Sequence, residues 1–99
     1  MSKTQLDESF ASLLEELAAL EHQRWAHWQK YVHDSGQRQP DGSILLPAEI
    51  VSRWEKQINT PYVDLSDEEK DSDREQVRKY LPLLERWLNR TLSKSGDDA

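Results

Sequence analysis

The chain has 99 residues, of which 35% are hydrophobic and 32% are charged, and it carries a formal net charge of −6 with no cysteine. This length supports one hydrophobic core, and the acidic balance argues against long nucleic acids, which require many phosphate-neutralising side chains. Without cysteine there are no disulfides and no zinc–thiolate sites. No apolar run reaches the ~18 residues of a membrane span, and residues 1–10 lack a signal-peptide pattern. We therefore expect a cytoplasmic domain whose partners include neither a membrane nor a long nucleic acid.

The first predicted element is a long helix over residues 4–33, because apolar side chains recur there every three or four residues. Ser2 or Thr4 can cap its start. The segment 34–36 predicts its end, since Gly36 readily takes the left-handed conformation of a helix terminus. The apolar stripe consists of Phe10, Leu13, Leu14, Leu17, Trp25, Trp28 and Val32.

The middle of the chain contains a loop over residues 37–47 and a second helix. Pro40-Asp41-Gly42 predicts a turn, and residues 43–46 form a short apolar stretch that we expect to be extended. Pro47 suits the first turn of a helix. That helix ends near Ile58, because residues before Pro61 disfavour helical geometry.

The third helical segment opens with Ser66-Asp67-Glu68-Glu69, a capping box in which Ser66 and Glu69 satisfy each other's backbone amides. Its apolar pattern continues to Leu92, but Pro82 predicts a kink or break near Tyr80. The expected fold is mostly α, a small three- to four-helix domain over residues 1–92 with a short extended segment around residues 43–46. Residues 93–99 are expected to be a flexible polar tail.

Polar side chains interrupt the apolar stripes at two places. Glu21 stands in line with core positions of the first helix, and Lys70, Asp73 and Arg74 continue the face of the last apolar stripe. Because an unpaired buried charge is costly, one interpretation is a structural ion pair between Glu21 and Arg74. The other is a pocket walled by aromatic side chains and floored by these charges.

The four tryptophans divide in the same way. Trp87 continues a leucine-rich face and is predicted to pack in the core. Trp25, Trp28 and Trp54 are either core residues or stacking surfaces for a planar ligand. The basic residues near them in sequence, which would meet an anionic group, are Arg24, Lys30 and Arg53.

No constellation of residues predicts catalysis. The three histidines do not share i, i+4 spacing, so they form no metal pair on one helix. The acidic stretch 64–73 lacks the glycine and the ligand spacing of a calcium loop. No nucleophile motif and no glycine-rich phosphate loop is present. We therefore expect no enzyme activity, no metal and no cofactor.

Two blocks of sequence, residues 17–25 (LAALEHQRW) and residues 60–74 (TPYVDLSDEEKDSDR), resemble the ryanodine-receptor repeat domain. The resemblance is to the single-copy form found in bacterial and phage proteins. It implies a helical, non-catalytic fold that binds a nucleotide or nucleotide-derived signal. The matching motif positions are His22, Trp25, Pro61, Tyr62, Lys70, Asp73 and Arg74. Residues 36–46 and the helix around Trp54 depart from the channel versions of the domain.

Two functions remain as hypotheses. The first is a module that senses or sequesters a nucleotide-like small molecule. Its expected ligand-binding residues are His22, Trp25, Trp54, Tyr62, Lys70, Asp73 and Arg74. The alternative is a protein-interaction or assembly module that acts as a homodimer without a small-molecule ligand.

Overall fold

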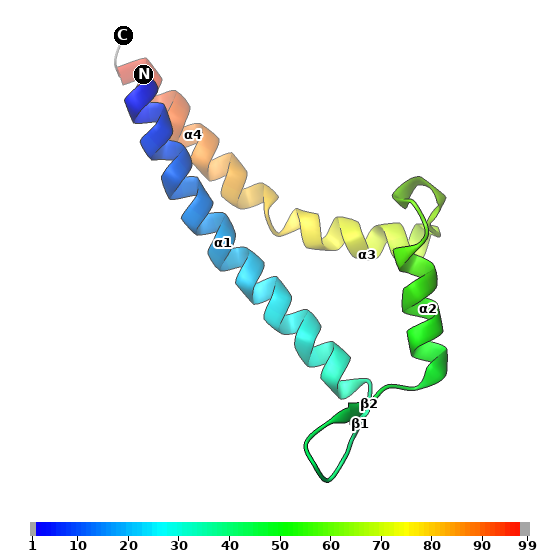
Figure 1. Ribbon diagram of the computed structural model, residues 1–99. Helices are drawn as coiled ribbons and strands as arrows, with labels where there is room; N and C mark the ends of the chain where they lie inside the picture. The colour runs from blue at the N-terminus through cyan, green and yellow to red at the C-terminus, as the bar shows by residue number, and fades with distance from the viewer. Residues whose placement is uncertain (1, 98–99) are drawn as a thin grey trace. The chain divides into compact units, whose positions relative to one another are not determined.

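The computed structural model describes residues 2–97, with side chains as far as residue 93, and is mostly helical (Figure 1). This confirms the predicted small, mostly α fold with a short extended segment. In chain order the elements are α1 (Lys3–Asp34), β1 (Gln37–Arg38), β2 (Ile44–Leu45), α2 (Ala48–Ile58), the 3-10 helix η1 (Tyr62–Asp64), α3 (Asp67–Arg78) and α4 (Leu81–Asp97).

The chain divides into two compact units. Unit 1 comprises residues 1–24 and 74–99, and unit 2 comprises residues 25–73. Unit 1 therefore contains the N-terminal two-thirds of α1, the end of α3 and all of α4. Unit 2 contains the end of α1, the β-hairpin, α2, η1 and the start of α3. The region predicted as one domain therefore contains parts of both compact units.

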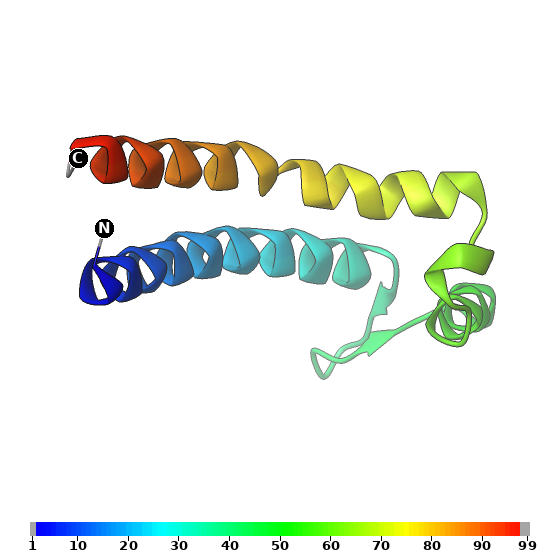
Figure 2. The ribbon, with the colours of Figure 1, turned by 90° about the horizontal axis from the view of Figure 1, so that it is seen from above.

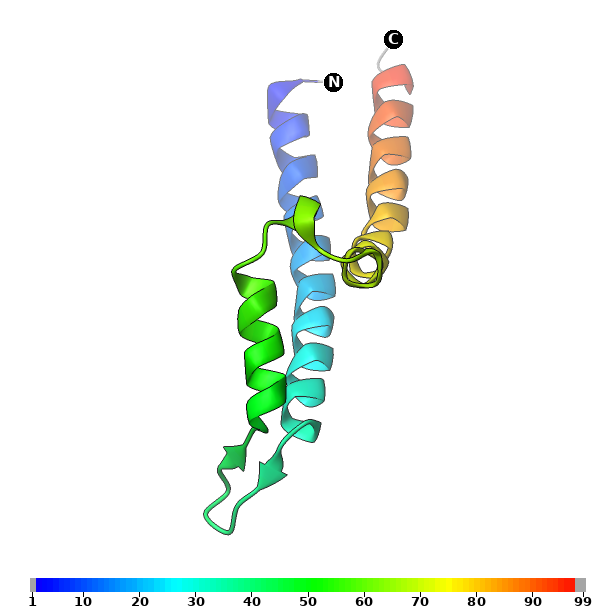
Figure 3. The same ribbon diagram turned by 90° about the vertical axis from the view of Figure 1, so that its right-hand side faces the viewer.

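Unit 1 is built around an antiparallel pair of helices, the N-terminal part of α1 and α4. We call this pair the helical hairpin, although residues 25–73 separate its two helices in the sequence. Figures 2 and 3 show the N-terminal part of α1 and the helix α4 running in opposite directions. The hydroxyls of Ser9 and Thr91 lie 3.2 Å apart, and the Trp87 indole Nε1 donates to the Ser9 carbonyl at 3.0 Å. Phe10 stacks on Trp87 with ring centroids 5.2 Å apart. Trp87 therefore packs between the helices, as its place in the leucine-rich face predicts.

The start of α1 carries a capping box that the sequence predicted only in part. The Gln5 amide donates to the Ser2 hydroxyl at 3.1 Å, and the Ser2 amide donates to the Gln5 side-chain oxygen at 2.8 Å. Each side chain thus satisfies a backbone amide that the first helical turn leaves without an intrahelical acceptor. Ser2, and not Thr4, is the cap.

The predicted break near Tyr80 is present between α3 and α4. α3 ends at Arg78 and α4 begins at Leu81, which places Pro82 second in the new helix. A proline there costs little, because the first turn of a helix has amides with no intrahelical acceptor. α4 then continues to Asp97, so much of the predicted flexible tail 93–99 is helical. Nothing between Leu92 and Asp97 is a strong helix breaker except Gly96. Residues 98–99 lie outside the described part of the chain.

Unit 2 contains a short β-hairpin. Gln37 pairs with Leu45 and Arg38 with Ile44 in antiparallel register, which gives the predicted extended segment a partner that the sequence did not reveal. The predicted turn is confirmed: the Gly42 amide donates to the Gln39 carbonyl at 3.0 Å. Gly42 has φ +90°, a left-handed conformation that favours glycine.

α1 ends at Asp34, and Gly36 just after it is required for a reason other than the predicted one. Its backbone is not left-handed; positive φ among the described glycines occurs at Gly42. A Cβ atom at Gly36 would lie 2.9 Å from the Leu45 carbonyl oxygen and 3.0 Å from a methyl carbon of Leu46. Glycine is required at this position because strand β2 lies too close to leave room for a side chain.

α2 begins one position after the predicted start, and α3 begins as predicted. Pro47 is the N-cap residue of α2. At α3, the Glu69 amide donates to the Ser66 hydroxyl and the Ser66 amide donates to the Glu69 carboxylate, both at 3.2 Å. This reciprocal pair confirms the capping box.

The described residues bury little apolar surface. Leu13, at 8% exposure, is the one large apolar side chain among them that is classed as buried. Many others remain exposed. In unit 1 these are Phe10, Leu14, Val77, Leu81, Leu84, Leu88 and Leu92, and in unit 2 they include Trp25, Trp28, Tyr31, Leu45, Ile58, Tyr62 and Val63.

Candidate functional site

Unit 1 leaves a set of apolar side chains uncovered on both of its long helices. We call this set the apolar face of unit 1. Each member is exposed by between 37% (Leu84) and 65% (Leu14). The face consists of Phe10 and Leu14 on α1 and of Leu81, Leu84, Leu88 and Leu92 on α4.

Helical rotation from the contact residues places these six side chains toward the same side of the hairpin. On α4, Leu88 and Leu92 each follow by one position a residue that contacts α1, namely Trp87 and Thr91. On α1, Phe10 follows the contact residue Ser9 in the same way. One position turns a side chain by about 100° around the helix axis. Because the two helices are antiparallel and face each other, this rotation brings Phe10 on α1 and the two leucines on α4 to the same side.

The ion pair between the helices lies toward the opposite side. Arg90 Nη2 donates to Glu16 Oε2 at 3.1 Å, and both side chains are about half exposed. Arg90 comes one position before Thr91, so the helix turns it away from the apolar face. An exposed pair of this kind contributes little to stability, and it leaves the apolar face without a cover.

Glu21 is held by two neighbours in unit 1. Its carboxylate accepts two hydrogen bonds from the guanidinium of Arg24, one of them from Nε at 3.0 Å, and a 2.5 Å hydrogen bond from the Tyr80 hydroxyl. The Arg24 bonds, and then the Tyr80 bond, lower the pKa of Glu21 to about 2. The same carboxylate raises the pKa of the Tyr80 hydroxyl. Tyr80 thereby ties the start of α4 to α1.

Glu21 is thus bound through its carboxylate by both Arg24 and Tyr80. Its side chain is 50% exposed, so the expectation that it is buried on a core-facing stripe is wrong. Glu21 does continue the apolar stripe of α1, but at this position α4 leaves the stripe partly uncovered. The ion pair between Glu21 and Arg74 stays a prediction, and Arg74 does take part in a polar or ring contact.

Unit 2 gathers three aromatic rings from two helices. The ring centroids of Trp28 and Trp54 are 5.5 Å apart, and Tyr31 lies 5.4 Å from Trp28 and 6.4 Å from Trp54. These tilted contacts are typical of aromatic packing. Trp28 and Trp54 thus pack together, and Tyr31, which the sequence interpretation did not single out, completes the cluster. Its i, i+3 spacing from Trp28 was the available signal.

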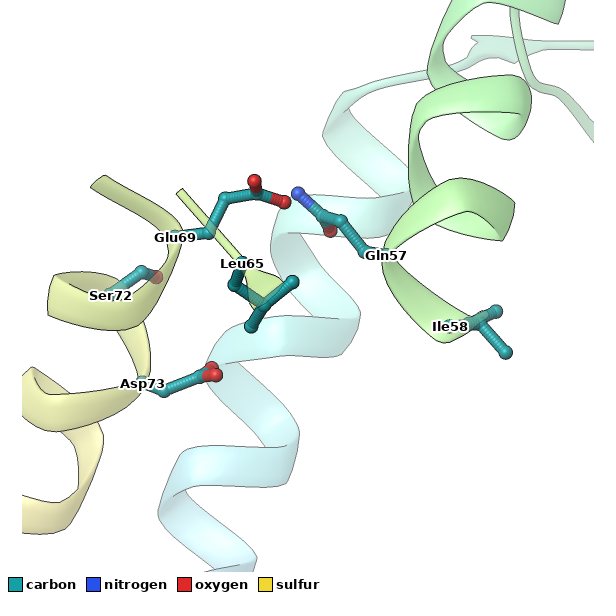
Figure 4. Close-up of a pocket in the computed structure, with 6 residues that line it drawn as sticks. All are labelled: Gln57, Ile58, Leu65, Glu69, Ser72 and Asp73. Atoms are coloured by element: carbon teal, nitrogen blue, oxygen red, sulfur yellow. The ribbon is translucent and has the colours of Figure 1, made fainter. Parts of the chain in front are cut away.

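Two of the predicted ligand residues meet at the start of α3. The Lys70 ammonium lies 5.8 Å from the centroid of the Tyr62 ring, a cation–π contact. Nearby, a pocket of about 310 Å³ lies between α2 and α3 (Figure 4). It is lined by Gln57, Ile58, Leu65, Glu69, Ser72 and Asp73.

The pocket carries negative charge. Figure 4 shows the Gln57 amide and the Glu69 carboxylate pointing toward one another. Hydrogen bonds from Ser66 lower the pKa of Glu69 and so favour the ionised form of this carboxylate. With Asp73 as a second carboxylate and no basic side chain among the described residues of its lining, the pocket disfavours phosphate. It is also near the lower limit of the volumes usual for small-molecule sites.

The predicted ligand residues are distributed over different surroundings. His22 and Arg74 belong to unit 1, and the other five belong to unit 2. Within unit 2, Trp54 joins the aromatic cluster, Tyr62 and Lys70 contact each other, and Asp73 lines the pocket. Trp25 is 53% exposed.

Comparison with known proteins gives no relative. No family model, curated protein or solved structure matches the chain significantly. The resemblance to the ryanodine-receptor repeat therefore stays a prediction from two sequence blocks. Within residues 2–97, no helix has both the length and the apolar character of a membrane span. The same residues contain no group of three or more metal-binding side chains.

Proposed function

We propose that this protein is an assembly module that forms a homodimer through the apolar face of unit 1. The observation that carries the proposal is the placement of Phe10 and five leucines along one side of a two-helix hairpin. Two helices cannot enclose a core by themselves, whereas four can. A second hairpin of the same kind supplies the missing two helices.

The exposed apolar surface is large enough to matter energetically. Complete burial of a leucine or phenylalanine side chain contributes roughly 1.5–3 kcal/mol, so covering a half-exposed one contributes about 1 kcal/mol. Twelve such side chains in two copies together reach the range of ~4–15 kcal/mol that association costs. Soluble monomers rarely leave a contiguous apolar surface of this kind uncovered.

Leu14→Gln tests the proposal. We expect this change to weaken self-association at least tenfold, measured as molar mass by light scattering over a range of concentrations, because the amide would be buried without a partner. Leu45→Gln is the matched control. Leu45 is 62% exposed, close to the 65% of Leu14, but it lies on strand β2 of unit 2.

The control variant should self-associate like the unchanged protein. Equal behaviour of Leu14→Gln and the unchanged protein would overturn the proposal. So would equal weakening by both variants, because the effect would then follow from general loss of apolar surface.

Binding of a nucleotide-like ligand is a second candidate function, which the contact between Lys70 and Tyr62 favours. A half-exposed aromatic ring beside a cation provides groups for both a base and a phosphate. The carboxylates of the neighbouring pocket oppose it, so this function ranks second.

A panel of nucleotides that includes cyclic dinucleotides tests this candidate. A true ligand raises the melting temperature by mass action, and Lys70→Gln should remove the shift while Lys3→Gln, a substitution on unit 1, should not. Absence of any shift at millimolar concentrations across the panel would contradict it.

A further inference from the structure

We infer that the two copies form an antiparallel four-helix bundle in which each α1 packs against the partner's α4, with the twofold axis parallel to the helices. This inference rests on the proposed homodimer and adds its arrangement. A self-complementary contact between identical chains has twofold symmetry. Two hairpins stacked face to face allow only two directions for that axis.

The two directions give different neighbours. An axis parallel to the helices places α1 opposite the partner's α4. An axis across the helices, within the plane of contact, places α1 opposite the partner's α1 and α4 opposite the partner's α4. Both arrangements bury the apolar face, so the side chains at its ends must decide between them.

The contacts within one hairpin fix the heights of its side chains. Ser9 is level with Thr91, Phe10 with Trp87, and Glu21 with Tyr80. Leu14 therefore falls level with the stretch between Leu84 and Leu88. Because an axis parallel to the helices preserves height, Leu14 then faces the leucines of the partner's α4 at the same level. Phe10 and Leu14 thus meet apolar side chains of the partner's α4 in the middle of the contact.

The other arrangement brings like charges together. Asp7 and Glu21 stand on the same side of α1 as Phe10 and Leu14, at helical spacing, and they flank the apolar residues at each end. If α1 crossed the partner's α1 centred on Leu14, Asp7 would come level with Glu21 of the partner subunit. Two facing carboxylates repel, and the pairing of Glu21 with Arg24 reduces this repulsion without reversing it.

The net charges of the two helices also favour α1 beside the partner's α4. Residues 3–24 carry five carboxylates and two cationic side chains, whereas residues 81–93 carry two arginines and one glutamate. An acidic helix next to the partner's α4 is favoured over two acidic helices side by side. The contribution acts at longer range, because Arg90 faces away from the apolar face and pairs with Glu16, and salt screens it. Alternation of α1 and α4 around the bundle follows.

The absence of cysteine from the chain allows a direct test by disulfide trapping. Chains carrying Leu14→Cys are mixed with chains carrying Leu88→Cys and oxidised mildly. A disulfide requires Cα atoms within about 7 Å, so only side chains that face each other are trapped. We expect the mixed disulfide between the two variants to dominate, with at least fivefold less of the dimer that Leu14→Cys forms with itself.

The outcomes separate the arrangement from the proposed function. Efficient trapping of Leu14→Cys with itself would overturn the alternating arrangement and leave the homodimer intact. Absence of any trapped dimer, together with a monomeric mass of the unchanged protein, would overturn both. Leu45→Cys in unit 2 serves as the control for random collision, and its yield sets the background.

Discussion

The hydroxyl of Tyr80 donates a 2.5 Å hydrogen bond to the carboxylate of Glu21, and this contact joins the break before α4 to the middle of α1. Arg24 binds the same carboxylate. The hydrogen bond between Tyr80 and Glu21 fixes the position of α4 along α1 at one end of the apolar face. Its chemistry also gives measurable consequences.

The first prediction concerns the ionisation of Tyr80. Because the Glu21 carboxylate raises the pKa of the Tyr80 hydroxyl, Glu21→Gln should lower that pKa toward the ordinary value near 10. Carbon-13 NMR of labelled tyrosine, titrated with base, resolves the three tyrosines separately. An unchanged pKa of Tyr80 in the variant would show that the hydrogen bond is absent in solution.

The second prediction concerns acid stability. Glu21 has a pKa of about 2 in the folded chain and an ordinary value of 4.5. A group whose pKa is lowered by folding contributes stability that is present above the ordinary pKa and is lost as the pH falls toward the folded one. The free energy of unfolding should therefore decline between pH 4.5 and about 2.

Glu21→Gln should flatten part of this decline, because glutamine does not titrate. Urea denaturation at several pH values measures it, with Glu8→Gln on the exposed side of α1 as the control. An equal pH dependence in the unchanged protein and in Glu21→Gln would contradict the assignment.

The third prediction separates two roles of glycine in unit 2. Gly36→Ala should destabilise the protein by about 1–3 kcal/mol, because its Cβ would press on the Leu45 carbonyl. Gly42→Ala should cost about 1–2 kcal/mol from left-handed strain alone, since no atom lies within 4 Å of the added Cβ.

Asparagine distinguishes these two causes, because it tolerates left-handed geometry. Gly42→Asn should recover most of the loss seen for Gly42→Ala, whereas Gly36→Asn should be at least as harmful as Gly36→Ala. Urea denaturation of the four variants tests this, and recovery at Gly36 would disprove the steric explanation.

Local signals in the sequence predicted most of the elements. Ser66 and Glu69, Pro82 and the Pro40-Asp41-Gly42 turn act through bonds or sterics between near neighbours, and each appears where it was expected. The partner of strand β2 and the role of Gly36 depend on contacts between segments that are distant in sequence. No pattern within either segment encodes them.

The candidate site was less predictable for the same reason. Periodicity identified Leu14 and Leu88 as members of apolar stripes but assigned the stripes to a core. A stripe looks the same whether its own chain or a second copy covers it. Glu21 likewise stood out as a charge in an apolar stripe, yet its partners Arg24 and Tyr80 follow from side-chain geometry that spacing alone does not define.

The molar mass of the unchanged protein in solution tests the central claim most directly. Sedimentation equilibrium over a range of micromolar concentrations should give twice the chain mass of 11.6 kDa, with a shift toward the single-chain mass only on strong dilution. A mass of one chain at every concentration would contradict the assignment of the apolar face of unit 1 as a dimer interface.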